Sequence, residues 1–169
     1  MCGRSFSGKS TVAAILVRAF AAEAVSLDAI NAERGLWGGD GITIAEWSRT
    51  YELARERAAA ALDAGAVVIV DDTSSPRFLR DGWRQLAREH DRPMVLVHLD
   101  VSVETSLARQ AANRRDPRRG DLTDDVMREH LDSFEPPTSD ENAIRVTADS
   151  DPDALIAALR QALLVTPPP

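Results

Sequence analysis

A glycine-bounded loop followed directly by an apolar helical pattern is the feature that most restricts the fold of this chain. Residues 3–10 complete the pattern G-x-x-x-x-G-K-[ST], and Lys9 within it is the only lysine of the chain. In such a loop backbone N–H groups surround a phosphate, the lysine reaches the β- and γ-phosphates, and the serine hydroxyl ligates Mg²⁺. The following helix directs its positive end at the same anion. The alternative is a plain Gly/Ser turn before an ordinary helix, and the complete motif favours a phosphate-binding loop.

This loop predicts that the chain binds a nucleoside triphosphate, ATP by default, together with Mg²⁺. Lys9 is the first candidate catalytic residue, because its ammonium would contact the phosphates between which the bond breaks. The predicted nucleotide-binding residues are Gly3, Arg4, Ser5, Phe6, Ser7, Gly8, Lys9, Ser10 and Thr11.

Short apolar runs alternate along the chain with helical patterns. Strands are expected over residues 24–27, 66–70, 94–99 and 143–147, and Thr43 with Glu46 has the form of a capping box that opens a long helix. The alternation predicts an α/β fold in which helices cover both faces of a parallel sheet and ligands bind at the carboxyl ends of the strands. We expect a single domain over residues 1–165 and a disordered tail at 166–169.

The segment before the loop is unusually short. A phosphate-binding loop normally follows a central buried strand, yet only Met1 and Cys2 precede Gly3. We therefore expect the first strand to be missing or truncated, and a start assigned too late in the chain is the favoured explanation. A chain without this strand would be unstable and would bind ATP poorly.

Three aspartates follow predicted strands and are candidates for the chemistry. Asp71 and Asp72 come after the apolar run 66–70, where a carboxylate can hold Mg²⁺ beside Ser10. Asp28 follows the strand at 24–27 and is a candidate base for a hydroxyl nucleophile. The alternative for all three is capping of the next turn, which is a common use of aspartate.

An arginine-rich segment interrupts an otherwise acidic chain and is a candidate lid over about residues 109–122. Arginine binds phosphate in a bidentate manner and can neutralise charge that develops during phosphoryl transfer. A solvated charged surface is the alternative, and the position of the segment about 100 residues after the loop favours a lid. Its arginines are Arg109, Arg114, Arg115, Arg118 and Arg119, of which Arg109 and Arg114 are the candidate catalytic residues.

Composition excludes several classes of function. A formal net charge of −7 argues against a protein that coats nucleic acid non-specifically. The sequence has no apolar run long enough for a membrane span, and its single cysteine cannot form an internal disulfide, so we expect a cytoplasmic protein. The three histidines have no metal-ligand spacing, and we assign His130 to a surface or helix position.

Together these motifs resemble the small P-loop kinases related to the phage polynucleotide 5′-kinase, the chloramphenicol phosphotransferase and the zeta-toxin kinases, which are ATP-binding proteins of the AAA_33 type. The matching segments are residues 3–11, Asp28, residues 67–73 with Arg77, and residues 107–115. The resemblance implies a three-layer P-loop kinase fold with strand order 2-3-1-4-5. It also implies that Asp28 is the base and that Arg109 and Arg114 are lid arginines.

Two positions depart from this family pattern. Ser74 replaces an asparagine after Asp72, and Asn31 stands where polynucleotide kinases have an arginine that grips the phosphate of the acceptor. Arg34 lies one helical turn further on and is a candidate substitute. The departure at Asn31 favours an acceptor without a phosphate at that point.

The leading hypothesis is an ATP-dependent kinase that phosphorylates a hydroxyl of a small molecule and acts as a monomer or homodimer. Trp47 is a candidate pocket wall, with core packing as the alternative. The second hypothesis is a polynucleotide or tRNA 5′-hydroxyl kinase, and the third is a nucleotide-binding module without catalysis. The predicted metal ligands are Ser10, Asp71 and Asp72, and the predicted substrate-binding residues are Asp28, Asn31, Arg34, Trp37 and Arg77.

Overall fold

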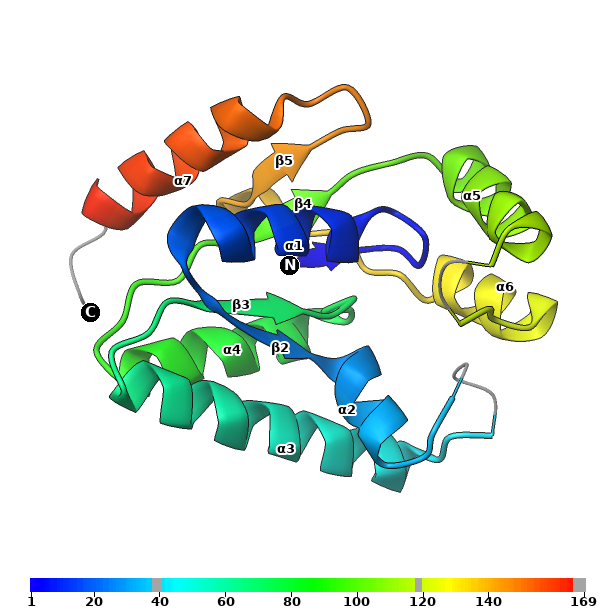
Figure 1. The fold of residues 1–169 in the computed structure, drawn as a ribbon, viewed down its shortest axis with the longest axis horizontal. Coiled ribbons are helices and arrows are strands. Elements are labelled where there is room, and N and C mark those ends of the chain that lie inside the picture. The colour runs from blue at the N-terminus through cyan, green and yellow to red at the C-terminus, as the bar shows by residue number, and fades with distance from the viewer. Residues whose placement is uncertain (38–40, 118–119, 166–169) are drawn as a thin grey trace.

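Parallel strands form the middle layer of the molecule (Figure 1). The computed structural model describes residues 1–37, 41–117 and 120–165. The strands are β1 (Cys2–Gly3), β2 (Glu23–Ser26), β3 (Val68–Asp71), β4 (Val97–Leu99) and β5 (Ile144–Val146). The helices are α1 (Lys9–Phe20), α2 (Leu27–Glu33), α3 (Ile44–Asp63), α4 (Arg77–Glu89), α5 (Val103–Arg115), α6 (Asp124–Asp132), a short 3₁₀ turn η1 (Ser139–Glu141) and α7 (Pro152–Val165).

Helices cover both faces of this layer. On one face α1 and α7 bury Leu16, Leu155 and Leu159 against β4 and β5. On the other face α3 and α4 pack on β2 and β3 around Val25 and Trp83. These two apolar clusters, one on each face of the strand layer, confirm the predicted three-layer α/β fold.

The strand pairing agrees in part with the expected order 2-3-1-4-5. β2 pairs with β3 along its whole length, and β1 pairs with β4, which pairs with β5. Between β3 and β1 there is no regular ladder among the described residues. Two hydrogen bonds connect the halves, from the Gly3 amide to the Thr73 carbonyl (3.2 Å) and from the Met1 amino group to the Val70 carbonyl (2.8 Å).

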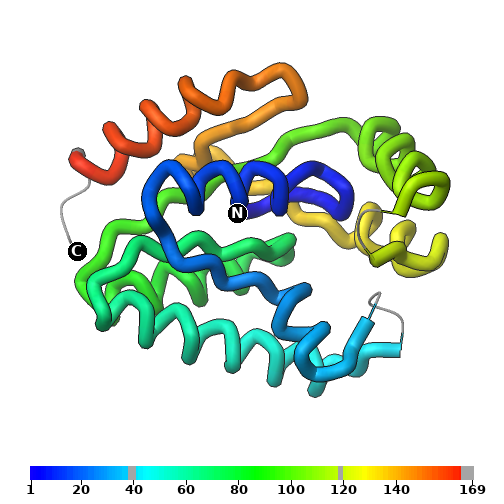
Figure 2. Tube along the Cα trace, in the orientation of Figure 1, coloured from blue at the N-terminus to red at the C-terminus, as the bar shows by residue number. Residues whose placement is uncertain are grey.

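The strand before the phosphate-binding loop is present but consists of two residues. The chain traced in Figure 2 therefore enters the middle of the sheet near the end at which the strands terminate. An apolar cavity of about 360 Å³ lies between β3 and the segment that leads into β4, lined by residues that include Val68, Val70 and Leu96. The strand expected at 94–99 begins only at Val97, because the two-residue β1 pairs with His98 and Leu99 and does not extend to residues 94–96.

The capping box predicted from the sequence is formed, and two further helices begin at side-chain caps. Thr43 and Glu46 make a reciprocal capping box at the start of α3. Ser102 caps α5 by accepting a hydrogen bond from the Thr105 amide, and Thr123 caps α6 in the same way. Each side chain satisfies an amide that the helix itself leaves unpaired, so the boundaries are fixed by residues next to them.

A buried ionic cluster holds the turn after β3. The side chains of Arg80 and Glu141 are fully buried and form two hydrogen bonds of 2.7 Å, and Arg84 donates a third to Glu141. Arg80 also donates to the Ser74 carbonyl (2.9 Å), and the Ser74 hydroxyl donates to Asp72 (3.0 Å). The cluster therefore connects α4 and the segment after α6 to the end of β3.

Candidate active site

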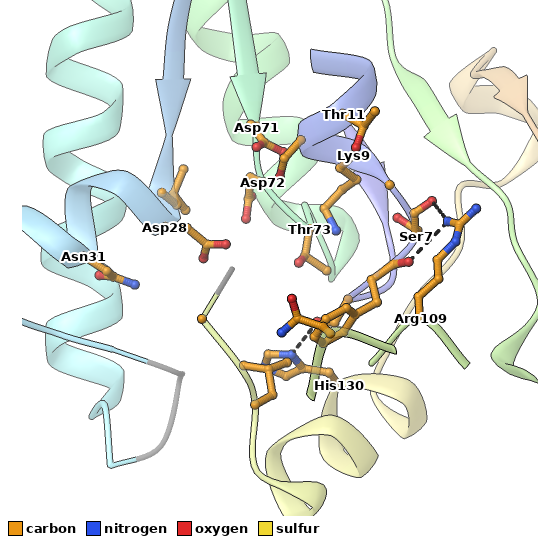
Figure 3. Close-up of a pocket in the computed structure, with 18 of the residues that line it drawn as sticks. Ser7, Lys9, Thr11, Asp28, Asn31, Asp71, Asp72, Thr73, Arg109 and His130 are labelled. Carbon is orange, nitrogen blue, oxygen red and sulfur yellow. Dashed lines mark hydrogen bonds between the residues drawn. The ribbon is translucent and has the colours of Figure 1, made fainter. Parts of the chain in front are cut away.

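A cavity of about 740 Å³ lies at the carboxyl ends of the strands, where the alternation of strands and helices predicts a ligand site. Its walls come from the phosphate-binding loop, the start of α2, the start of α3, the end of β3, α5 and α6. Figure 3 shows Lys9, Asp28 and Asp72 directed into the same space from three separate parts of the chain. The cavity therefore brings together the residues that the sequence motifs single out.

The phosphate-binding loop has the backbone conformation that its glycines allow. Gly8, at the N-cap of α1, has φ of 100°, which is in the left-handed region. A Cβ on Gly3 would lie 2.9 Å from the Leu99 carbonyl oxygen, so a larger residue would push the loop away from β4. Both glycines are therefore required by the geometry of the loop.

Lys9 is buried at the base of this loop. Its ammonium donates hydrogen bonds of 2.8 Å to the carbonyl oxygens of Gly3 and Arg4. The following residues, Ser10 and Thr11, are exposed at the first turn of α1 and line the cavity. This arrangement places a cation, a helix N-terminus and two hydroxyl groups around one space, which suits a polyphosphate.

Arg109 extends from α5 to the phosphate-binding loop. Its guanidinium donates to the carbonyl oxygens of Ser7 (2.6 Å) and Phe6 (3.3 Å), and it lines the cavity beside Gly8. The predicted lid arginine is thus in contact with the phosphate-binding loop, and its role in phosphate binding stays a prediction.

Asp71 and Asp72 line the cavity at the end of β3. Burial raises the pKa of Asp72, while the hydrogen bond from Ser74 and the charge of Lys9 oppose that shift. Among the described residues no group of three or more His, Cys, Asp and Glu side chains could hold a metal ion alone. Mg²⁺ usually binds one or two carboxylates together with substrate phosphates, so the hydroxyl of Ser10 and these two carboxylates fit that ion.

Asp28 lies in the first turn of α2, one residue beyond the predicted strand end. Ser26 caps this helix by accepting a hydrogen bond from the Ala29 amide (3.3 Å), so capping does not require Asp28. The carboxylate of Asp28 is directed into the cavity (Figure 3). The cap of α2 is thus made by Ser26, and the role of Asp28 as a base stays a prediction.

Asn31 follows one turn later and is buried. Its amide oxygen accepts a hydrogen bond from the Thr50 hydroxyl of α3, and the side chain also lines the cavity. Trp37 and Trp47 line the same side, although Trp37 is 69% exposed. The structure thus gives Trp47 the pocket-wall position that the sequence left open.

Four arginines predicted for the site do not line the cavity. Arg4 of the phosphate-binding loop donates to the Val101 carbonyl (3.5 Å), and its guanidinium lies over the ring of Phe134. Arg34 donates to the Glu46 carbonyl (2.7 Å) and to the Thr50 hydroxyl, Arg77 pairs with Asp140 (2.6 Å), and Arg114 pairs with Asp121 and Asp124 (2.7 Å each). Arg114 also donates to the carbonyl of Leu122 (2.9 Å), a residue that does line the cavity. The roles predicted for these arginines in nucleotide binding, substrate binding or catalysis stay predictions. Arg118 and Arg119 of the candidate lid lie outside the described residues.

The structure adds one residue that sequence reasoning placed elsewhere. Nδ1 of His130 lies 2.9 Å from the Ser5 hydroxyl of the phosphate-binding loop, and His130 lines the cavity. Burial lowers the pKa of His130. The charge of Lys9 also lowers this pKa, whereas the charge of Asp28 raises it. The available signal was the spacing from Met127, which is buried against Phe6 and lies three residues earlier on the same face of α6.

No helix in the described ranges has the length and apolar character that crossing a membrane requires.

Comparisons with known proteins place this cavity in a known fold. The sequence matches the AAA_33 family, described as an AAA domain, over residues 1–137. A comparison with curated protein sequences gave no match.

Solved structures with the same fold include several kinases. A sugar kinase from Janibacter sp. HTCC2649 is 24% identical with a TM-score of 0.68, and the match covers 98% of this chain and 93% of that chain. The Mycobacterium tuberculosis APS kinase CysC, solved with AMPPNP and APS, is 20% identical with a TM-score of 0.65 and coverage of 96% and 94%. Kti12 from Chaetomium thermophilum, solved with ADP-AlF3, is 17% identical with a TM-score of 0.65 and coverage of 96% for both chains. At these identities the likeness establishes the P-loop kinase fold.

Proposed function

This chain belongs to the AAA_33 family, and from that premise we propose that it is an ATP-dependent kinase that phosphorylates a hydroxyl group of a small molecule. The observation that carries the proposal is the convergence of Lys9, Asp28 and Asp72 on one cavity. A nucleotide-binding loop alone would support binding. A carboxylate opposite that loop supplies the second requirement of phosphoryl transfer, which is a group that orients the nucleophile and accepts its proton.

The reaction follows from the positions of these side chains. The acceptor hydroxyl lies against Asp28, which takes its proton while the acceptor oxygen forms a bond to the γ-phosphorus. The bond between that phosphorus and the bridging oxygen breaks, and ADP leaves. Lys9 and Arg109 hold the phosphate oxygens on which negative charge gathers. Mg²⁺, held by Ser10 with Asp71 or Asp72, would neutralise the β- and γ-phosphates.

Three observations support a small-molecule acceptor: the structures with this fold, the walls of the cavity and the net charge of the chain. The solved structures with this fold include proteins described as a sugar kinase, an APS kinase and a gluconokinase from Sinorhizobium meliloti 1021. The acceptor side of the cavity is enclosed by α2 and α3, with Trp37 and Trp47 as walls. Such a pocket suits a compact molecule better than a nucleic-acid strand, and the net charge of −7 also opposes a polyanion.

The test is ADP release across a panel of sugars, nucleosides and hydroxyl-bearing antibiotics. We expect Asp28→Asn to lower kcat by about 10²–10⁴-fold with the selected acceptor, the usual loss when a general base is removed. The variant should keep its thermal stabilisation by ATP, because Asp28 is not part of the phosphate-binding loop. Asp125→Asn is the matched control, since Asp125 is exposed on α6 and does not line the cavity.

Three outcomes would contradict the proposal. Unchanged acceptor-dependent turnover in Asp28→Asn would show that Asp28 is not the base. ATP-induced stabilisation without turnover of any acceptor would favour a nucleotide-binding module, and transfer to oligonucleotide 5′ ends with a steep salt dependence would favour a polynucleotide kinase.

A further inference from the structure

Three side chains at α6 lie along the phosphate-binding loop. Met127 and His130 are three residues apart on α6, and Phe134 follows four residues later, just beyond the end of that helix. This spacing places the three side chains on one face, which we call the α6 face. In Figure 1 α6 lies beside the loop that connects β1 to α1, and the α6 face is directed at this loop.

Each member of the α6 face contacts a different residue of the loop. The helix and the loop run in opposite directions there, so the order of the loop residues is reversed along the helix. Three consecutive loop residues are thus held by one face. The pairs are Phe6 with Met127, Ser5 with His130, and Arg4 with Phe134.

Two of these contacts involve polar groups. Nδ1 of His130 lies 2.9 Å from the Ser5 hydroxyl, and Figure 3 shows the ring directed at the loop. Ser5 is buried, so this hydrogen bond satisfies a hydroxyl that is largely shielded from water. The guanidinium of Arg4 lies over the ring of Phe134, 4.7 Å from its centroid, which is a cation–π contact.

The third contact supports a strained backbone. Phe6 has φ of 59°, in the left-handed region that a bulky residue rarely adopts. Such a conformation persists only where the surrounding structure compensates for the strain. The Phe6 side chain is buried in one apolar cluster with Leu122 and Met127. The packing of Phe6 against α6 therefore holds the loop in a conformation that its own sequence disfavours.

The α6 face is itself held by α5. The carbonyl of Leu122 accepts hydrogen bonds from Gln110 (3.0 Å) and Arg114 (2.9 Å). On the same helix Arg109 donates to the Ser7 carbonyl (2.6 Å). The two helices together therefore contact all four residues between the two glycines of the loop.

Resting on the proposed binding of ATP, we propose that Met127, His130 and Phe134 are positioning residues that hold the phosphate-binding loop in the conformation that receives the phosphates. Without the α6 face, Phe6 leaves the left-handed region, and ATP has to restore this conformation when it binds. The α6 face thus sets the affinity for ATP by acting through the loop.

Met127→Ala is the first test, because it removes the packing under Phe6. We would measure the Kd for the non-hydrolysable analogue AMPPNP with Mg²⁺ by calorimetry, at a temperature where each variant is folded by circular dichroism. We expect the Kd to rise by about 5–30-fold, the range for binding that must restore one strained backbone conformation. Met127→Leu keeps the volume of the side chain and should stay within about twofold of the wild-type Kd.

Phe134→Leu is the second test and covers the case in which Met127→Ala does not fold. Leucine keeps apolar contact with Cys2 and Leu96 but removes the ring under Arg4. We expect the Kd for AMPPNP to rise by about 2–5-fold, the range for one cation–π contact.

The matched control is Leu86→Ala. Leu86 is as buried as Phe6 but lies on α4, in the apolar cluster on the other face of the strand layer. The substitution leaves a cavity in the core without touching the loop. It should lower Tm and change the Kd for AMPPNP by less than about twofold.

Hydrogen exchange of the Ser7 amide reports on the loop without any nucleotide. This amide donates to the Arg4 carbonyl (3.1 Å) within the loop. Its exchange, measured by NMR on the free protein, should be about 5–30-fold faster in Met127→Ala and unchanged in Leu86→Ala, because only the first variant releases the loop.

A folded Met127→Ala variant with a Kd within about twofold of wild type would overturn the proposal, as would the same result for Phe134→Leu where Met127→Ala does not fold. Equal losses of affinity in Leu86→Ala would also overturn it, because global stability would then explain the effect. A wild-type protein that does not bind AMPPNP would instead refute the proposed kinase function. In that case the exchange of the Ser7 amide still decides whether the α6 face orders the loop.

Discussion

Glu141→Gln is the substitution with the best-defined effect on stability. The wild-type carboxylate accepts hydrogen bonds from Nε and Nη2 of Arg80 and from Nη2 of Arg84, each 2.7 Å long. Glutamine keeps the size of the side chain but loses the charge. It also replaces one carboxylate oxygen by an NH₂ group. Oε1 accepts from Arg80 and from the Thr138 amide, and Oε2 accepts from Arg80 and Arg84, so in either orientation two acceptor contacts become contacts between donors.

The magnitude follows from burial and from the contacts that remain. Removing one partner of a buried ion pair costs about 3–5 kcal/mol, because the other charge stays buried without its partner. Arg80 keeps its hydrogen bonds to the carbonyl oxygens of Ser74 and Glu135, so we expect the lower end, about 3 kcal/mol. In a chain of 169 residues this corresponds to a fall in Tm of about 6–12 °C.

The pH dependence gives a second, independent measurement. The Arg80 and Arg84 guanidiniums hold the pKa of Glu141 well below its usual range. Its contribution to the free energy of unfolding is therefore complete above the unfolded pKa of about 4.3 and is lost as the pH falls below that value. The difference in Tm between wild type and Glu141→Gln should be largest at neutral pH and should narrow from about pH 4.3 downward.

Calorimetry at pH 7 measures the expected fall in Tm, and calorimetry at pH 3–5 measures how far the difference in Tm narrows. Asp140→Asn is the control, because Asp140 pairs with Arg77 on the surface and its side chain is 59% exposed. It should change Tm much less, since exposed ion pairs contribute little. A Tm for Glu141→Gln within about 2 °C of wild type, equivalent to less than about 1 kcal/mol, would refute the assignment of the pair as a strong buried contact.

The remaining predictions concern the phosphate-binding loop. Arg109→Met should lower kcat by about 10²–10³-fold, the loss expected for one donor to a developing charge. Arg114→Met should instead lower Tm and leave kcat near the wild-type value. Equal kcat losses in steady-state assays would contradict the different positions of the two arginines. His130→Asn should raise KM for ATP by about 2–10-fold through the lost hydrogen bond to Ser5; an unchanged KM would show that the bond does not position the loop. Because burial lowers the pKa of His130, the free energy of unfolding should fall as the pH drops below about 6.5, where unfolded histidine gains a proton. Chemical denaturation between pH 6.5 and 5 should show a shallower fall in His130→Asn, with buried His98 contributing a further fall of the same sign.

Sequence patterns predicted those parts of the fold that depend on neighbouring residues. The capping box at Thr43 and Glu46 is a local interaction, and the structure confirms it. The ends of the strands depend instead on a partner strand that is remote in sequence. Residues 94–96 have the apolar character of a strand, but the two-residue β1 pairs only with His98 and Leu99. The shortening of β4 therefore could not be predicted from its own residues.

In the candidate site too, some residues could be predicted from local motifs and others depend on contacts with remote parts of the chain. Lys9, Asp28, Asp71 and Asp72 were found because each lies in or directly after a motif whose position in the fold is fixed. Arg109 and Arg114 could not be separated by sequence, although they are five residues apart on α5 and so point in different directions. Only the packing of α5 between the loop and α6 directs one to Ser7 and the other to Asp121 and Asp124.

Arg34 is a residue whose role in acceptor binding was predicted from its spacing but depends on its contacts in the fold. Its spacing of three residues from Asn31 suggested that it replaces the arginine with which polynucleotide kinases grip an acceptor phosphate. However, α2 ends at Glu33, and Arg34 is its C-cap, so the side chain turns onto α3 and binds Glu46 and Thr50. The same Thr50 hydroxyl holds Asn31. A phosphate could recruit Arg34 only by breaking both of its contacts, at a cost of about 1–3 kcal/mol for each group left unpaired. In this structure Arg34 therefore does not take the place of the arginine that is absent at position 31, which supports the prediction of an acceptor without a phosphate at that point.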